Sequence, residues 1–151
     1  MFCWYLNNKA GIYFDRLPLV AVRYYVPSMT TEEKQAIEKY PFICKQTINV
    51  CLKDIKKNRH YNFKIRKGYC YDGASVPRLF WRVIGANTDN RFLVSALIHD
   101  VLCEHHEYVN NDRSFSTDVF NALLEGSGVG RLKRFLMKNS VAFYQTLFCC
   151  W

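Results

Sequence analysis

The stretch INVCLKDIKKNRHYNFKI, residues 48–65, decides the fold of this chain. Apolar and polar residues alternate in both of its halves. The apolar positions are Ile48, Val50, Leu52, Tyr61, Phe63 and Ile65. Because the side chains of a strand point alternately to its two faces, a period of two places each set on one face. The polar run at 56–60 supplies a turn, so the stretch predicts an antiparallel hairpin with one buried face.

The residues before this hairpin predict three further strands and one short helix. The expected ranges are 2–6, 11–14 and 17–25 for the strands and 31–39 for the helix. The helix is expected to follow Thr30, because Thr30 and Glu33 form a Ser/Thr-x-x-Glu pattern in which each side chain bonds a free backbone amide. Pro41 is expected to end it, since proline cannot continue a helix.

Helical periodicity replaces the strand pattern after about residue 68. The expected helices span about 78–84, 91–107, 112–125 and 130–148, and the last two are separated by a glycine-dense turn. Strands first and helices second predict an α+β fold, in which N-terminal antiparallel hairpins and a small sheet pack against three to four C-terminal helices. We expect one domain over residues 1–151, mainly β with one short helix over 1–67 and mainly α over 68–151.

The composition favours a folded, basic protein. Half of the 151 residues are hydrophobic and 16% are aromatic, which is enough to build a core without a metal or disulfide staple. The 21 Lys and Arg residues against 13 Asp and Glu give a net charge of +8, which attracts nucleic acid, membrane surfaces or acidic proteins. Seven cysteines without a CxxC pair favour a reducing compartment. We expect no signal peptide and no transmembrane segment.

Basic residues concentrate in and around the predicted hairpin. They are Lys53, Lys56, Lys57, Arg59, Lys64, Arg66 and Lys67. One interpretation is a solvated hairpin. The other is a nucleic-acid surface, in which phosphates would be bound by Lys56, Lys57, Arg59, Lys64 and Arg66, with steep salt dependence.

Two helix starts carry polar residues that are candidates for chemistry. Asp72 and Ser75 precede the short helix expected over 78–84, and each can cap that helix or belong to a site. Arg113 and Asp118 lie in the first turns of a later helix, five residues apart. Arg113 would either pair with a buried carboxylate in a structural network or orient an anionic substrate group. Both interpretations stay open.

The middle of the longest expected helix carries a histidine next to an aspartate, His99 and Asp100. His99, Cys103 and His106 are spaced so that they share one helical face, and imidazole and thiolate are both metal ligands. A hydrogen-bonded core histidine is the structural alternative. The adjacent pair is also similar to that of metal-dependent phosphohydrolases, but the further histidines that those enzymes need are missing.

Five segments of the C-terminal half together resemble one family. They are Asp72-Gly-Ala-Ser-Val-Pro77-Arg, Phe80-Trp81, His99-Asp100-x-Leu102, Asp112-Arg113 and Thr117-Asp118-x-x-Phe120. In order and spacing they resemble an uncharacterised family of phages and bacteria, domain of unknown function 1353, over about residues 61–146. Cys103 departs from the family pattern, which usually has an aromatic residue there. The resemblance marks six candidate catalytic residues: Asp72, Ser75, His99, Asp100, Arg113 and Asp118.

The resemblance implies a phage or prophage protein, located in the host cytoplasm or the virion, and leaves three functions open. The first is an accessory protein of the virion or tail, or one that contacts a host protein. The second is a small hydrolase with a divalent metal ion, held by His99 and Asp100 together with Asp72 or Asp118. The third is a basic accessory protein that binds nucleic acid.

Overall fold

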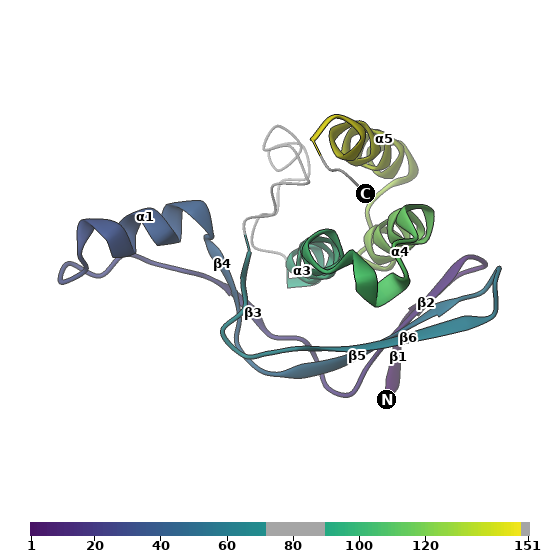
Figure 1. The fold of residues 1–151 in the computed structure, drawn as a ribbon, viewed down its shortest axis with the longest axis horizontal. Coiled ribbons are helices and arrows are strands. Elements are labelled where there is room, and N and C mark those ends of the chain that lie inside the picture. Colours follow the sequence, from purple (N-terminus) through teal and green to yellow (C-terminus); the bar gives the residue numbers. More distant parts are fainter. Residues whose placement is uncertain (72–89, 149–151) are drawn as a thin grey trace.

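The computed structural model of the chain describes residues 1–71 and 90–148, and within them the side chains of 1–71 and 93–139. Figure 1 shows the arrangement of the elements. In chain order they are β1 (Phe2–Leu6), β2 (Ala10–Phe14), β3 (Val20–Val22), α1 (Thr31–Lys39), β4 (Phe42–Cys44), β5 (Ile48–Asp54), β6 (Arg59–Ile65), β7 (Cys70–Tyr71), α3 (Asn90–Glu104), the 3₁₀ helix η1 (His106–Val109), α4 (Arg113–Gly126) and α5 (Arg131–Phe148). Antiparallel sheets come first and helices second, so the predicted α+β fold is confirmed.

The larger sheet has four antiparallel strands in the order β1-β2-β5-β6. The predicted hairpin lies at one edge of it, and Leu52 of β5 pairs with Tyr61 of β6 on one side and with Ile12 of β2 on the other. Every second residue of β5 is buried, and β6 becomes alternately buried from Tyr61 onward. The alternation in the sequence therefore marks the face that packs on the helices.

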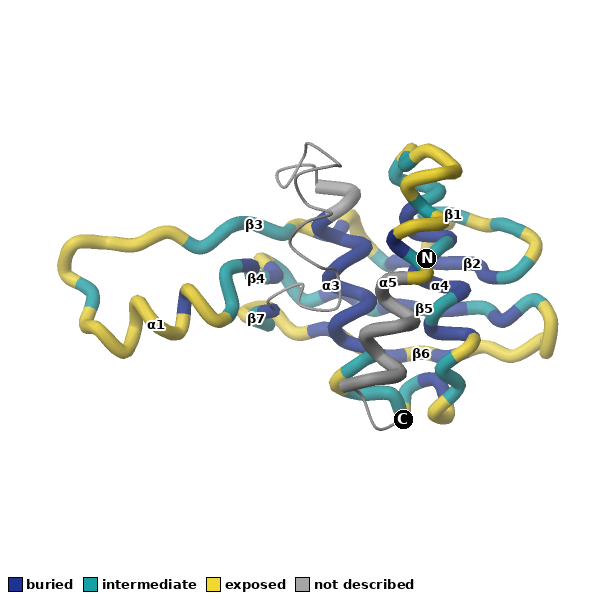
Figure 2. The backbone as a smooth tube through the Cα atoms, turned by 90° about the horizontal axis from the view of Figure 1, so that it is seen from above, coloured by how far each residue is buried: buried dark blue, intermediate teal, exposed yellow. Residues whose placement is uncertain are grey.

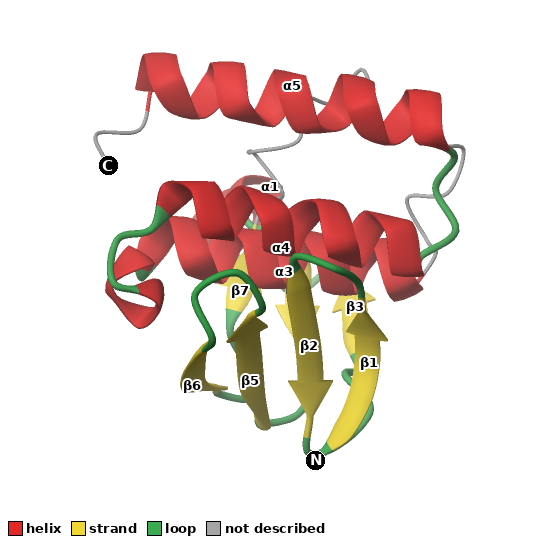
Figure 3. Ribbon diagram, turned by 90° about the vertical axis from the view of Figure 1, so that its right-hand side faces the viewer, coloured by secondary structure: helices red, strands yellow, loops and turns green. Residues whose placement is uncertain are grey.

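The helices form two layers on that face. Figure 3 shows α3 and α4 lying directly on the sheet, with α5 packed on top of them. Every residue from Leu93 to Leu102 is buried, so α3 has no solvent-facing side over these turns. The sequence predicts only an apolar stripe for this helix, whereas its central position buries it on all sides.

A second, three-stranded sheet has the order β3-β4-β7 and lies beside α3. Beyond it, α1 projects away from the body of the protein, as Figure 2 shows. The predicted start of α1 is confirmed: Glu33 N donates to Thr30 Oγ1 at 3.2 Å, and Thr30 N donates to Glu33 Oε2 at 2.7 Å. Only Ile37 of this helix is buried, so α1 is held mainly by its own caps and its flanking strands.

Several predicted boundaries are corrected by the structure. The strand expected over 17–25 is only Val20–Val22, because β4 offers just three pairing residues. The helix expected over 91–107 ends at Glu104, where His105 leaves helical geometry and a 3₁₀ turn follows. β4 and β7 are too short to show a period of two, and the sequence did not predict them. The helix expected over 78–84 lies outside the described residues.

The close approach of α4 to the sheet requires glycine at position 126. A Cβ atom there would lie 2.9 Å from two ring carbons of Tyr5 on β1. We therefore expect Gly126→Ala to lower the free energy of unfolding by about 1–3 kcal/mol, because the overpacked helix must shift. In a Tyr5→Ala background the same substitution should cost much less, and urea unfolding of the four proteins measures this coupling. Equal costs in both backgrounds would mean that the ring does not set the approach.

Candidate functional site

His99 is a fully buried histidine in the middle of α3, with 1% of its surface exposed. Its ring packs on Phe120 of α4 at 4.5 Å between centroids, and the Cys103 Sγ atom lies 3.7 Å from its Nδ1. Burial disfavours the charged form and lowers the pKa of His99 from 6.5 to about 4. The imidazole is therefore neutral at pH 7, a state suited both to core packing and to binding a metal ion.

Asp100 is buried on the same helix, and its charge acts on Tyr71 at the end of β7. Burial raises the pKa of Tyr71, and the negative charge of Asp100 raises it further. The Tyr71 hydroxyl also donates a 2.8 Å hydrogen bond to the carbonyl oxygen of Leu93. The end of β7 is thus fixed to the first turn of α3, while Asp72 and Ser75 lie outside the described residues.

Asp118 lies on α4 and pairs with the lysines of two sheet turns. Its carboxylate oxygens are 3.4 Å from Lys56 Nζ and 4.0 Å from Lys9 Nζ. Within 1–71 and 93–139, no three His, Cys, Asp or Glu side chains are grouped so that they could hold a metal ion. The structure therefore does not bring Asp118 to His99 and Asp100 as a ligand set.

Arg113 and its neighbour Asp112 begin α4. Asp112 caps the helix by accepting a 3.0 Å hydrogen bond from Phe115 N, and it also accepts one from Lys57 Nζ. Burial opposes ionisation of Asp112, but the hydrogen bonds from Lys57 and Phe115 outweigh it, so the pKa of this carboxyl is lowered. Arg113 is half-buried as the first residue of the helix, and its carbonyl accepts from Thr117 Oγ1 at 3.0 Å.

The helical face expected for His99, Cys103 and His106 is not formed. The first two lie on α3, whereas His106 lies on η1 and its ring contacts Asn111 Oδ1. The cause is the end of α3 at Glu104, which breaks the spacing of seven residues. His106 is thus separated from the candidate site.

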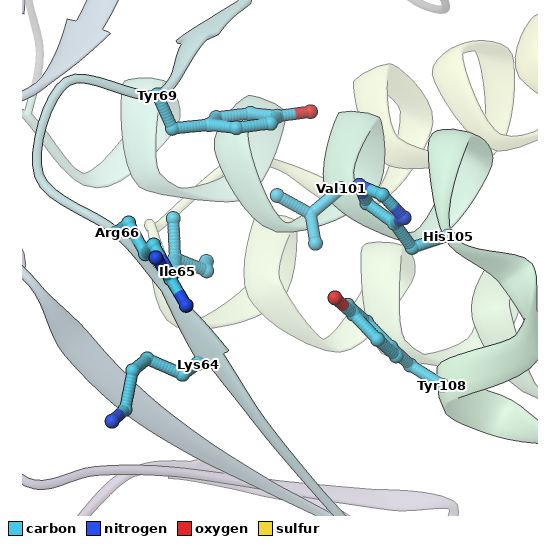
Figure 4. A pocket seen from close by; sticks show the side chains of 7 residues that line it. All are labelled: Lys64, Ile65, Arg66, Tyr69, Val101, His105 and Tyr108. Carbon is cyan, nitrogen blue, oxygen red and sulfur yellow. The ribbon is translucent and has the colours of Figure 1, made fainter.

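A hollow of about 250 Å³ was not predicted from the sequence. It lies between the edge strand β6 and the end of α3, as Figure 4 shows. Its walls come from three separate segments: residues 64–66, Tyr69, and the stretch from Val101 to Tyr108. The one signal in the sequence is the basic run Lys64, Arg66 and Lys67 followed by Tyr69, and it does not reveal the opposite wall.

Known proteins that are similar to this chain carry little functional information. A family described as "Protein of unknown function (DUF1353)" matches residues 49–141. "Uncharacterized protein y4jT" of Sinorhizobium fredii (strain NBRC 101917 / NGR234) is 46% identical over 33 residues, which are 22% of this chain and 10% of that protein. The chain thus spans about a tenth of the length of that curated relative. No solved structure matches the chain.

The buried neutral His99 makes stability depend on pH. The pKa of His99 is lower in the folded protein than in the unfolded chain, so this residue does not oppose folding above pH 6.5. As the pH falls from 6.5 toward 4, the unfolded chain binds a proton that the folded protein does not, and the free energy of unfolding decreases. We expect the free energy of unfolding to drop by roughly 2 kcal/mol between pH 7 and pH 5. Urea unfolding at both values measures the drop.

His99→Gln should remove most of this slope, whereas His60→Gln, at an exposed position, should keep it. An unchanged slope in His99→Gln would assign the pH dependence to another group.

Proposed function

The chain belongs to the DUF1353 family, and on that premise we propose that it is a phage-encoded accessory protein that acts by binding other proteins, in the virion or tail or in the host. The phage origin rests on the motif resemblance, because that family occurs in phages and bacteria. The binding role rests on one feature of the fold, a projecting arm. Within the described residues, no helix is both long and apolar enough to cross a membrane.

The arm is residues 17–44, which comprise β3, α1, β4 and their connections. Figure 2 shows it extending from the body with most of its residues exposed. Five of its apolar side chains are exposed within ten residues: Leu17, Leu19, Tyr24, Tyr25 and Val26. Tyr24 is the most exposed of the five, at 77%. Single exposed apolar residues are normal, but a group of them on one projecting segment is typical of a contact surface.

Hydrogen bonds hold the arm in a defined shape. Arg23 N donates to the Pro41 carbonyl oxygen at 2.7 Å, and the Arg23 guanidinium donates to the Tyr40 carbonyl oxygen at 3.1 Å. The Tyr25 hydroxyl donates to Glu38 Oε1 at 2.8 Å, which ties the connection to α1. A preformed surface loses less entropy when it binds, and exposed tyrosines are frequent anchors of protein interfaces. The arm therefore supports a binding role better than a purely structural one.

The arm is tested with a variant that removes apolar surface and keeps its internal hydrogen bonds. In Tyr24→Ser/Val26→Ser the side chain of Tyr25 and the backbone are unchanged. The immobilised full chain should retain a phage or host protein from a lysate of phage-infected bacteria. The arm variant should retain about tenfold less of that protein, as measured by quantitative mass spectrometry and then by titration of the purified partner.

A matched control is available on α5. Leu132 and Phe135 are 72% and 64% exposed, so Leu132→Ser/Phe135→Ser removes similar apolar area elsewhere. This control should bind like the wild type. Equal losses in both variants would indicate general adhesion, and no loss in the arm variant would remove the arm as the interface.

A small metal-dependent hydrolase is the second candidate function. It is favoured by His99, whose neutral imidazole lies buried beside Asp100. Asp72 would complete the ligand set expected from the sequence, since Asp118 is paired with lysines.

Ion pairs to α4 also weaken the nucleic-acid alternative. Five residues were expected to contact phosphates, and two of them, Lys56 and Lys57, are bound to α4.

Metal content separates this second candidate from the first. Purified without a metal-binding tag, a hydrolase should carry about one divalent ion per chain. His99→Ala and Asp100→Ala should lose that ion while circular dichroism shows a retained fold, and His60→Ala should keep it. The hydrolase is rejected if the wild type binds no zinc, manganese or magnesium after incubation with each.

A further inference from the structure

The hollow beside β6 has the size of a small ligand site. β6 is an edge strand of the larger sheet, and the end of α3 and η1 close the hollow from the helical layer. Its volume of about 250 Å³ lies just below the roughly 300–1,000 Å³ of sites for drug-sized molecules. The hollow therefore suits one small planar ligand, or one unit of a longer chain.

Two tyrosine rings form walls of this hollow. Figure 4 shows Tyr69 and Tyr108 on opposite sides of it, with Val101 and His105 between them. The Tyr108 ring is stacked on Phe63 of β6 at 5.0 Å and 15°. His105 stacks against the same Tyr108 ring at 5.1 Å and 22°. Neighbouring rings thus hold this wall in place and cover the faces of Tyr108, so a planar ligand ring would stack on the opposite wall, Tyr69.

The other wall is fixed as well. The Tyr69 hydroxyl donates a 2.7 Å hydrogen bond to Glu104 Oε2 on α3, and its ring stacks on Tyr71 at 6.4 Å and 20°. The nearby Glu107 carboxylate lies 3.3 Å from the Nδ1 atom of His105. The carboxylates of Glu104 and Glu107 therefore already have partners on the walls of the hollow.

Two cations lie along the β6 side of the hollow, and the fold leaves both available. The side chains of Lys64 and Arg66 are exposed and form no ion pair or hydrogen bond with any residue that the structure describes. Lys56 and Lys57 on the same hairpin are instead engaged by Asp118 and Asp112 of α4. A guanidinium can bind phosphate through two parallel hydrogen bonds, and an ammonium adds a second charge.

We infer that this hollow binds one nucleotide unit, with its base stacked on Tyr69 and its phosphate on Arg66 and Lys64. A planar ring that carries an anionic group is the ligand class that fits stacked aromatic walls next to unpaired cations. A free mononucleotide and one nucleotide of a single strand share this chemistry. The site is separate from the arm, so the inference stands whether or not the arm binds a protein.

Titration calorimetry of the full chain tests the inference with four probes: adenosine 5′-monophosphate, adenosine, inorganic phosphate, and a short single strand of thymidine nucleotides. The monophosphate should bind more tightly than adenosine or phosphate. Lys64→Ala/Arg66→Ala should weaken it about tenfold, because charge-assisted hydrogen bonds are lost. Tyr69→Leu should weaken both the monophosphate and adenosine about tenfold, because a stacking ring is lost.

Controls on the same hairpin separate a built site from general attraction of anions. Arg59→Ala and Lys67→Ala remove exposed cations that do not line the hollow, and each should change the affinity less than about twofold. Equal losses in these controls would overturn the site. The double cation variant carries the test independently if Tyr69→Leu fails to fold.

The probes also identify the source of the nucleotide. Equal affinity for the monophosphate and for the strand supports a free nucleotide as the ligand. If the strand binds at least about tenfold tighter and the variants lose the same affinity for it, the ligand is a nucleic acid. If inorganic phosphate binds as tightly as the monophosphate, the aromatic rings contribute nothing to the affinity. That result, or the absence of binding of both the monophosphate and the strand, would overturn the inference.

Discussion

Ile12, Leu52 and Tyr61 lie side by side on three neighbouring strands, and the apolar face that they form must be covered by helices. α3 and α4 provide this cover, and α5 covers them in turn. Burial of apolar surface is the main favourable contribution to folding, so this contact fixes where the remaining elements can lie. The position of α3, buried on all sides from Leu93 to Leu102, follows from it.

That position has a chemical consequence for the two polar residues of α3. His99 and Asp100 lie in a low-dielectric interior, where an ionised or unpaired group is costly and is kept only with partners. Burial accordingly holds His99 neutral, and the charge of Asp100 acts on the tyrosine that ends β7. The burial of His99 and Asp100 is compatible with a structural polar network and with a metal-binding active site. The positions of the two residues therefore do not separate these alternatives, whereas the metal content of the purified protein does.

The basic residues of the β5–β6 hairpin differ in whether they are paired with the helices. Ion pairs from Lys56 and Lys57 to Asp118 and Asp112 tie the tip of the hairpin to α4 across 62 and 55 residues of sequence. Both lysines are largely exposed, so these pairs orient the elements more than they stabilise them. Lys64 and Arg66, beside the hollow at the opposite end of β6, are exposed and have no such pairs among the described residues.

The sequence by itself determined the β5–β6 hairpin, the start of α1 at Thr30, the order of strands and helices, and the family. These features depend on local periodicity, on cap chemistry within one turn, and on motif spacing, all of which are contained in short segments. Of the predicted site, His99 and Asp100 are buried together, while Asp118 is paired elsewhere and Asp72 and Ser75 lie outside the described residues. The end of α3 at Glu104 was visible only in the structure. The tertiary structure alone decided the short strands β4 and β7, the lysine pairs and the hollow, because each depends on contacts between segments that are distant in sequence.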